Sequence, residues 1–233
     1  MKKLMIAGVL LVAGHAHGAL SPQTPATVQD PLRLQAEGGD ARASYLMGRR
    51  YLDATGADYD PERARRWLQR AARAGYAPAQ VDLGQLFMEG TGGLRDVAQA
   101  RDWFRRAALQ GHPQAQFNLG NVYRQGLGVT VDDGEAVRWY RAAARQGHPQ
   151  AQYNLGLMYF FGRGVPMDLS RAAHWIAAAA AQGLAVAQYQ LANLYLAGDG
   201  VAKDPEAARR WLERAAAQGM VRARVKLEAL AGH

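Results

Sequence analysis

Cysteine is absent from the 233-residue sequence, which excludes disulfides, thiolate metal sites and lipid attachment at an N-terminal cysteine. Serine is nearly absent. It occurs at Ser21, Ser44 and Ser170, and none of these lies in a G-x-S-x-G or S-x-x-K motif, so a serine hydrolase is not expected. The rest of the composition, with 49% hydrophobic and 21% charged residues, is typical of a folded chain.

Lysine is scarce as well. Beyond residue 19 only Lys203 and Lys226 remain, so arginine supplies most of the formal charge of +8. A basic chain attracts anions, either nucleic acid or the anionic surface of a cell envelope. The envelope is favoured because the N-terminus predicts export, and no nucleic-acid partner is expected.

Residues 1–19 have the pattern of a secretory signal peptide. Two lysines precede the apolar run Leu4–Ala13, which is too short to span a bilayer, and small residues then offer cleavage after Ala16 or Ala19. The alternative is an uncleaved N-terminal anchor. We expect cleavage, a periplasmic location, and a flexible leader over residues 20–29.

The chain repeats with a constant period of 36 residues, which all five tryptophans follow: Trp67, Trp103, Trp139, Trp175 and Trp211. Columns of glycine, alanine, aspartate and aromatic residues keep the same spacing. A period of this length predicts an all-α fold, a right-handed α-solenoid of stacked helix-turn-helix repeats. Solenoids seldom carry chemistry and instead present an extended surface to a partner.

The third repeat illustrates why each unit should form two helices, which we call helix A and helix B. Helix A is predicted from Pro113, which suits a first helical turn, to Gln125. Gly126 should end it with a positive φ. Asp132 should cap helix B, which turns Trp139 inward.

A glycine also recurs inside helix A, at Gly48, Gly84, Gly120 and Gly156, and Ala192 replaces it in the last repeat. Two explanations are a positive φ and the close approach of a neighbouring helix. Because alanine resists positive φ, the replacement favours close approach. We predict that the tryptophan of helix B fills this space.

The repeat runs A-x-A-x-x-x-L-G-x-x-Y, then G-x-G-V-x-x-D, then A-x-x-W-x-x-x-A-A-x-x-G. This pattern resembles the Sel1-like repeat family, a branch of the tetratricopeptide-like α-solenoids. The resemblance covers residues 30–230, with Pro113 in place of the pattern's first alanine and an irregular loop in the first repeat at Ala54 and Ala57. It implies that helix A lines the concave side of the solenoid.

The period also predicts the domain limits. Five repeats occupy residues 40–219. Residues 30–39 are in register with a helix B and residues 220–233 with a helix A, so each end should carry one capping helix. Terminal repeats need a polar outer face, and the last helix supplies Arg222, Arg224, Lys226 and Glu228.

A partner-binding groove is expected on the face of helix A opposite its inward stripe. Amides and acids dominate this face, and Leu157 and Phe161 add exposed apolar groups, as in many protein-binding patches. The alternatives are tolerated surface drift or packing against an adjacent turn. The predicted partner-binding residues are Asp82, Gln85, Glu89, Asn118, Asn121, Gln125, Asn154, Leu157, Phe161, Gln190 and Asn193.

Arginines concentrate on helix B, away from the groove. They suit docking to anionic lipid head groups or to an acidic protein. The alternative, which we favour, is a solvated face with i,i+4 pairing. The set is Arg63, Arg65, Arg66, Arg70, Arg73, Arg101, Arg105, Arg106, Arg138, Arg141, Arg209, Arg210 and Arg214.

The six histidines form no metal-binding pattern. His112 and His148 stand in equivalent turns of successive repeats, so the sequence does not bring them together on a metal. His15 and His17 leave with the predicted signal peptide, and His174 and His233 have no companion at ligand spacing. No metal, cofactor or catalytic residue is predicted.

Together these observations predict a non-enzymatic periplasmic protein that holds a partner protein in its groove. Exported proteins with this resemblance regulate sensor kinases, assemble envelope machines or block toxic effectors. Small size and a bare solenoid favour a dedicated inhibitor or immunity protein against a secreted envelope-attacking effector, for example a lipase. The alternatives are an envelope assembly scaffold, a regulator of a sensor protein and, least in keeping with the sequence, a hydrolase.

Overall fold

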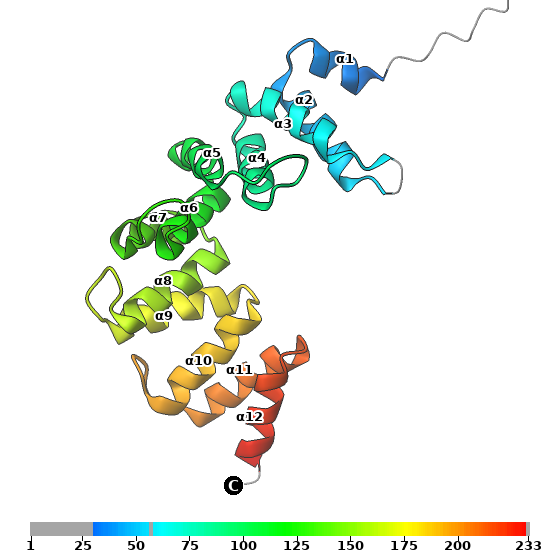
Figure 1. The fold of residues 1–233 in the computed structure, drawn as a ribbon. Helices are drawn as coiled ribbons and strands as arrows, with labels where there is room; N and C mark the ends of the chain where they lie inside the picture. Colours follow the sequence, from blue (N-terminus) through cyan, green and yellow to red (C-terminus); the bar gives the residue numbers. More distant parts are fainter. Residues whose placement is uncertain (1–29, 56–57, 232–233) are drawn as a thin grey trace, which may run out of the picture. The chain divides into compact units, whose positions relative to one another are not determined.

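The computed structural model describes residues 30–55 and 58–231, and in that part the chain forms twelve α-helices and no strand. The predicted signal peptide and leader, and Ala57 of the first loop, lie outside the described residues. Among the described helices, none has the length and apolarity that a membrane span requires. In chain order (Figure 1) they are α1 (Pro31–Glu37), α2 (Ala41–Asp53), α3 (Pro61–Arg73), α4 (Ala77–Glu89), α5 (Val97–Leu109), α6 (Pro113–Gln125), α7 (Asp133–Arg145), α8 (Pro149–Phe161), α9 (Leu169–Ala181), α10 (Ala185–Ala197), α11 (Pro205–Ala217) and α12 (Val221–Ala231).

The predicted hairpins are present. Helix A and helix B of each repeat pack together, and each helix B also packs against the helix A that follows it. The hairpins are α2–α3, α4–α5, α6–α7, α8–α9 and α10–α11. The described part of the chain is therefore an all-α solenoid of five repeats, as the period predicted.

The periodic aspartates set where each helix B begins. The carboxylate of Asp132 accepts the backbone N–H of Glu135 at 2.9 Å, and its own N–H donates to the carbonyl of Tyr123 at 3.0 Å, which closes the hairpin loop. Gly126 ends α6 with a φ of 67°, and its N–H donates to the carbonyl of Val122, as predicted. The same aspartate cap occurs at Asp60, Asp96, Asp168 and Asp204.

The glycine inside helix A marks close helix contact, but the prediction that tryptophan fills the space is wrong. A Cβ on Gly120 would lie 2.6 Å from the ring of Tyr140, the residue after Trp139. Consecutive helical residues point about 100° apart. Trp139 consequently faces the buried cluster that contains Trp103 and Leu119. The other pairs are Gly48 with Leu68, Gly84 with Phe104, and Gly156 with Ile176.

A pair of glutamines, one buried in helix A and one exposed just after helix B, recurs in four of the repeats and was not predicted from the sequence. The Nε2 of Gln152 donates to the carbonyl of Ala144 at the end of α7, at 3.2 Å, and its Oε1 accepts from Nε2 of Gln182 at 2.7 Å. Because a buried amide is costly to leave unpaired, these bonds fix how each repeat meets the one before it. The equivalent pairs are Gln80–Gln110, Gln116–Gln146 and Gln188–Gln218.

The helices at the two ends, α1 and α12, lie where the period places them, and their capping role stays a prediction. The expected polar outer face of α12 is only partly correct. Lys226 is half-buried because its Nζ donates to Asn193 Oδ1 at 2.5 Å, and Val225 is 56% exposed. The polar residues found exposed as predicted are Arg222, Arg224 and Glu228.

Candidate functional site

The predicted partner-binding residues lie on the A helices α4, α6, α8 and α10. Four of them are exposed: Gln85, Glu89, Gln125 and Phe161. The other seven are half-buried: Asp82, Asn118, Asn121, Asn154, Leu157, Gln190 and Asn193. The prediction that Leu157 is exposed is therefore wrong, because this side chain packs against the core cluster that contains Ile176.

Some of these polar side chains hold successive A helices together. Each bond joins two residues 33 positions apart, so it links one repeat to the next: Arg49–Asp82 at 3.1 Å, Asn121–Asn154 at 3.5 Å and Asn193–Lys226 at 2.5 Å. The Arg49–Asp82 contact is an ion pair. Part of the predicted polar surface thus has a structural role, which leaves fewer of its groups free for a partner.

Three predicted residues come together in a pocket of about 220 Å³ formed by α6, α8 and the loop after α8. We call it the phenylalanine pocket, and its lining is Arg124, Asn154, Leu157, Met158, Phe161 and Arg163. The Phe161 side chain is 62% exposed, and its ring meets that of Phe160 edge to face, with 5.0 Å between centroids. An exposed aromatic ring held by a second ring is a rigid anchor for a partner.

Two guanidinium groups flank this ring. The Nε of Arg124 donates to the hydroxyl of Tyr140 at 3.1 Å, and that hydroxyl donates to Asn121 Oδ1 at 2.6 Å. Burial raises the pKa of Tyr140, although the charge of Arg124 opposes the rise. The Cζ of Arg163 lies 6.0 Å from the Phe161 ring centroid.

The charges of this pocket are not balanced within the described residues. No carboxylate there forms an ion pair with Arg124 or Arg163. The phenylalanine pocket therefore combines positive charge with apolar surface, which suits a segment carrying an acidic residue beside an apolar one. Neither arginine was predicted from the sequence, since neither stands in the repeat columns expected to form the groove.

Most arginines of helix B are exposed, as the alternative favoured from the sequence predicts, and two of them form i,i+4 ion pairs. Arg66 pairs with Glu62 at 3.8 Å and Arg209 with Glu213 at 3.1 Å, both at i,i+4 spacing. Others lie over the tryptophan rings, which a guanidinium covers favourably: Arg70, Arg106, Arg138 and Arg214. Docking of helix B to an anionic surface stays a prediction.

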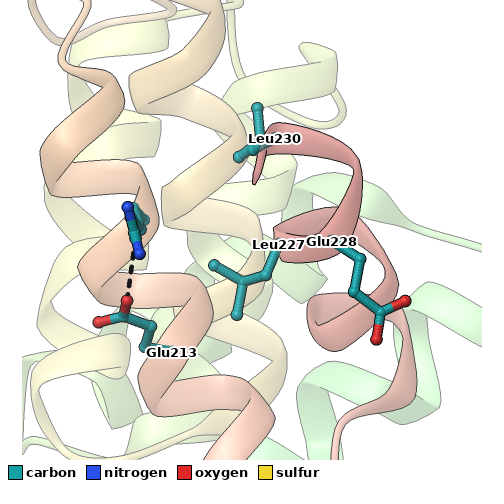
Figure 2. A pocket seen from close by; sticks show the side chains of 5 residues that line it. Glu213, Leu227, Glu228 and Leu230 are labelled. Carbon is teal, nitrogen blue, oxygen red and sulfur yellow. Dashed lines mark hydrogen bonds and ion pairs between the residues drawn. The ribbon is translucent and has the colours of Figure 1, made fainter. Parts of the chain in front are cut away.

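A second pocket, of about 300 Å³, lies between α11 and α12 (Figure 2). Figure 2 shows Leu227 projecting from α12 toward the helix that carries Glu213. The Glu213 carboxylate is already paired with Arg209, so the guanidinium in this lining is not free. This pocket is a weaker candidate than the phenylalanine pocket because its lining arginine is neutralised.

Metal ligands do not gather in residues 30–55 and 58–231, where no three His, Cys, Asp or Glu side chains converge. His148 stacks on Phe117 with 4.8 Å between centroids, and its Nε2 lies 3.0 Å from Gln114 Oε1. Burial lowers the pKa of both His112 and His148, and the proximity of His112 lowers that of His148 further. These interactions favour neutral rings with a packing role.

Comparison with known proteins follows the same repeat boundaries. The family model described as Sel1 repeat matches residues 41–76, 77–112, 113–148, 149–184 and 185–220, which is one match for each hairpin. No curated protein matches the chain.

Solved structures give the same result. A Sel1 repeat protein from Oxalobacter formigenes is 33% identical, with a TM-score of 0.76 over 85% of this chain and 78% of that one. The protective antigen c5321 of uropathogenic Escherichia coli, described as having an SLR fold, is 35% identical, with a TM-score of 0.65 over 84% of this chain and 50% of that one. A Sel1 repeat protein from Klebsiella pneumoniae is 25% identical, with a TM-score of 0.51 over 86% and 97%.

Proposed function

Because the chain belongs to the Sel1 repeat family, we propose that it is a non-enzymatic protein that binds a partner protein on its helix A face. Repeat solenoids bind partners along the surface that successive repeats share. On the helix A face of this chain, several half-buried polar groups already bond to one another and contribute little to partner binding. The free energy of binding must therefore come from other residues of the same face. The phenylalanine pocket supplies both apolar surface and unpaired charge on this face.

A single observation supports this location most strongly. Phe161 keeps 62% of its surface exposed on an A helix, next to the unpaired Arg163. Interface energy is concentrated in a few aromatic and arginine residues that fill or line a pocket. The pocket is small, so it fits one or two side chains of a partner rather than a whole domain.

Within this role we propose a dedicated inhibitor or immunity protein that acts in the periplasm against a secreted, envelope-attacking effector such as a lipase. The export pattern of residues 1–19 and the exposed aromatic ring of Phe161, which lies beside unpaired arginines, support it. An anchor of this kind suits one tight partner. An envelope assembly scaffold or a regulator of a sensor protein would instead need several contact surfaces.

Affinity capture with the tagged full chain from an envelope extract tests the proposal. The test variant is Phe161→Asp, because Leu157 packs in the core and charging it would disturb the fold. The matched control is Ala197→Asp, which places the same charge at an exposed residue of α10 in the same repeat column. We expect the wild type and the control each to capture one protein in a nearly equal molar amount. We expect Phe161→Asp not to capture this protein.

Two results would contradict the proposal. If Phe161→Asp captures as much partner as the wild type, the phenylalanine pocket is not the binding site. Capture of many envelope proteins in small amounts by all three chains rejects a dedicated inhibitor and favours the scaffold. Melting curves of the three proteins, which should coincide, show that the substitutions leave the fold intact.

A further inference from the structure

A cleft of about 460 Å³ lies on another part of the molecule, where α7, α8 and α9 meet. We call it the arginine cleft, and its lining is Arg141, Arg145, Tyr159, Arg171 and Trp175. None of these residues belongs to the phenylalanine pocket. The two sites can therefore be tested separately.

The tyrosine lies among the guanidinium groups of the cleft. The Nη2 of Arg141 donates to the Tyr159 hydroxyl at 3.1 Å, and the Cζ of Arg171 lies 5.6 Å from the centre of the tyrosine ring. Burial by itself would raise the pKa of Tyr159, but Arg141 and Arg171 together lower it. The cleft is thus an environment that favours negative charge on a group placed there.

The positive charge exceeds what the neighbouring acids neutralise. Arg171 pairs with Asp168 at 3.2 Å. In the described part of the chain neither Arg141 nor Arg145 forms an ion pair with a carboxylate. Two guanidinium charges therefore remain uncompensated beside the tyrosine and the half-buried Trp175.

The three arginines depart from the repeat, whereas the aromatic residues follow it. One repeat earlier, Leu109 and Glu135 stand in the columns of Arg145 and Arg171. Two repeats earlier, Arg73 is the one arginine in these three columns. One repeat later all three columns hold alanine: Ala177, Ala181 and Ala207. Helix packing needs the aromatic columns at every junction, so it does not account for three arginines at one of them.

We propose that the arginine cleft binds a phosphate group. A guanidinium fork bonds two oxygens at once, and one fork is enough for a carboxylate. A phosphate offers more oxygens, so it bridges several guanidinium groups. A phosphate monoester carries a charge of about −1.5 to −2 at neutral pH, and a diester such as a phospholipid head group carries a single negative charge, so the two uncompensated arginines can neutralise either. The phosphate is supplied either by a small phosphate compound or by a lipid head group.

The test measures binding by the full chain at an ionic strength of about 0.15 M, where loose surface attraction is largely screened. One arm titrates inorganic phosphate by calorimetry, and the other sediments the protein with phosphatidylcholine vesicles with and without phosphatidylglycerol. The cleft variant is Arg141→Gln/Arg145→Gln. The control is Arg73→Gln/Arg105→Gln, which removes the same charge from the same two repeat columns elsewhere.

We expect binding by the wild type and the control, and at least about tenfold weaker binding by the cleft variant, as the loss of charge-assisted hydrogen bonds predicts. Binding of phosphate without vesicles identifies a small phosphate compound as the source, and binding of phosphatidylglycerol vesicles identifies a head group. The proposal is overturned if neither arm shows binding or if the control weakens as much as the cleft variant. If the protein binds a polyglutamate peptide but not phosphate, the cleft is a carboxylate site, and the proposal is also overturned.

Discussion

The contact between Gly120 and Tyr140 gives the sharpest prediction about how the repeats pack. A Cβ at position 120 would lie 2.6 Å from Cδ1 and Cε1 of the Tyr140 ring. That ring cannot easily move, because hydrogen bonds to Asn121 and Arg124 hold its hydroxyl. Gly120→Ala should therefore force overpacking, which costs about 1–3 kcal/mol.

Helix propensity opposes this cost, since alanine in a helix is about 1 kcal/mol better than glycine. We therefore expect Gly120→Ala to lower the free energy of unfolding by about 0–2 kcal/mol, so the coupling to position 140 is the decisive quantity. The chain itself supplies the matched comparison. The equivalent pair in the last repeat is Ala192 with Leu212, and both are buried.

A double-mutant cycle makes the reasoning refutable. In a Tyr140→Leu background the same Gly120→Ala change should be neutral or stabilising, because the last repeat already packs an alanine with a leucine at these two columns, Ala192 and Leu212. The coupling energy between the two changes should be about 1–3 kcal/mol. The measurement is urea unfolding followed by far-ultraviolet circular dichroism. A single Gly120→Ala variant as stable as the wild type, with no coupling to position 140, would refute close approach as the reason for the glycine.

Three further predictions concern the core and its pH dependence. Trp139→Ala should cost about 3–5 kcal/mol and split the urea transition as the repeats uncouple, and one unchanged transition would contradict this. Gln152→Leu removes both hydrogen bonds of a buried amide, while the exposed Gln182 can bond to water, so it should cost about 1 kcal/mol in the same assay, whereas a neutral effect would deny the pair a structural role. Burial lowers the pKa of His112 and His148 from the ordinary value of 6.5, although Asp82 raises that of His112 slightly. The folded state then binds fewer protons than the unfolded state, so stability should fall as pH drops below 6.5 and fall less in His148→Gln; an identical pH profile would argue against it.

The local features of each repeat were predictable because single residues determine them. Pro113 and Gly126 mark the two ends of α6, and Asp132 marks the start of the next helix. These positions follow from backbone geometry and capping, which need no knowledge of neighbouring repeats.

Features that depend on how neighbouring helices meet were not predictable in the same way. A helical pattern gives the inward side of a helix, but it does not say whether Trp139 or Tyr140 meets the glycine opposite. Leu157 looked exposed because the pattern places it away from its own helix B, whereas it packs against a core cluster that includes α9 and α10. Arg163 follows α8 in a loop, where the period gives no side-chain direction.

The absence of cysteine from the chain allows the most direct test of the central claim, which is that a partner protein binds at the phenylalanine pocket. A single cysteine at Gln125→Cys, an exposed position next to Arg124 of the pocket lining, is labelled with a short photo-crosslinker and compared with one at the exposed Arg105→Cys on α5. We predict that the captured partner crosslinks from position 125 and not from position 105. Crosslinking from position 105 alone, or equally from both, would contradict it.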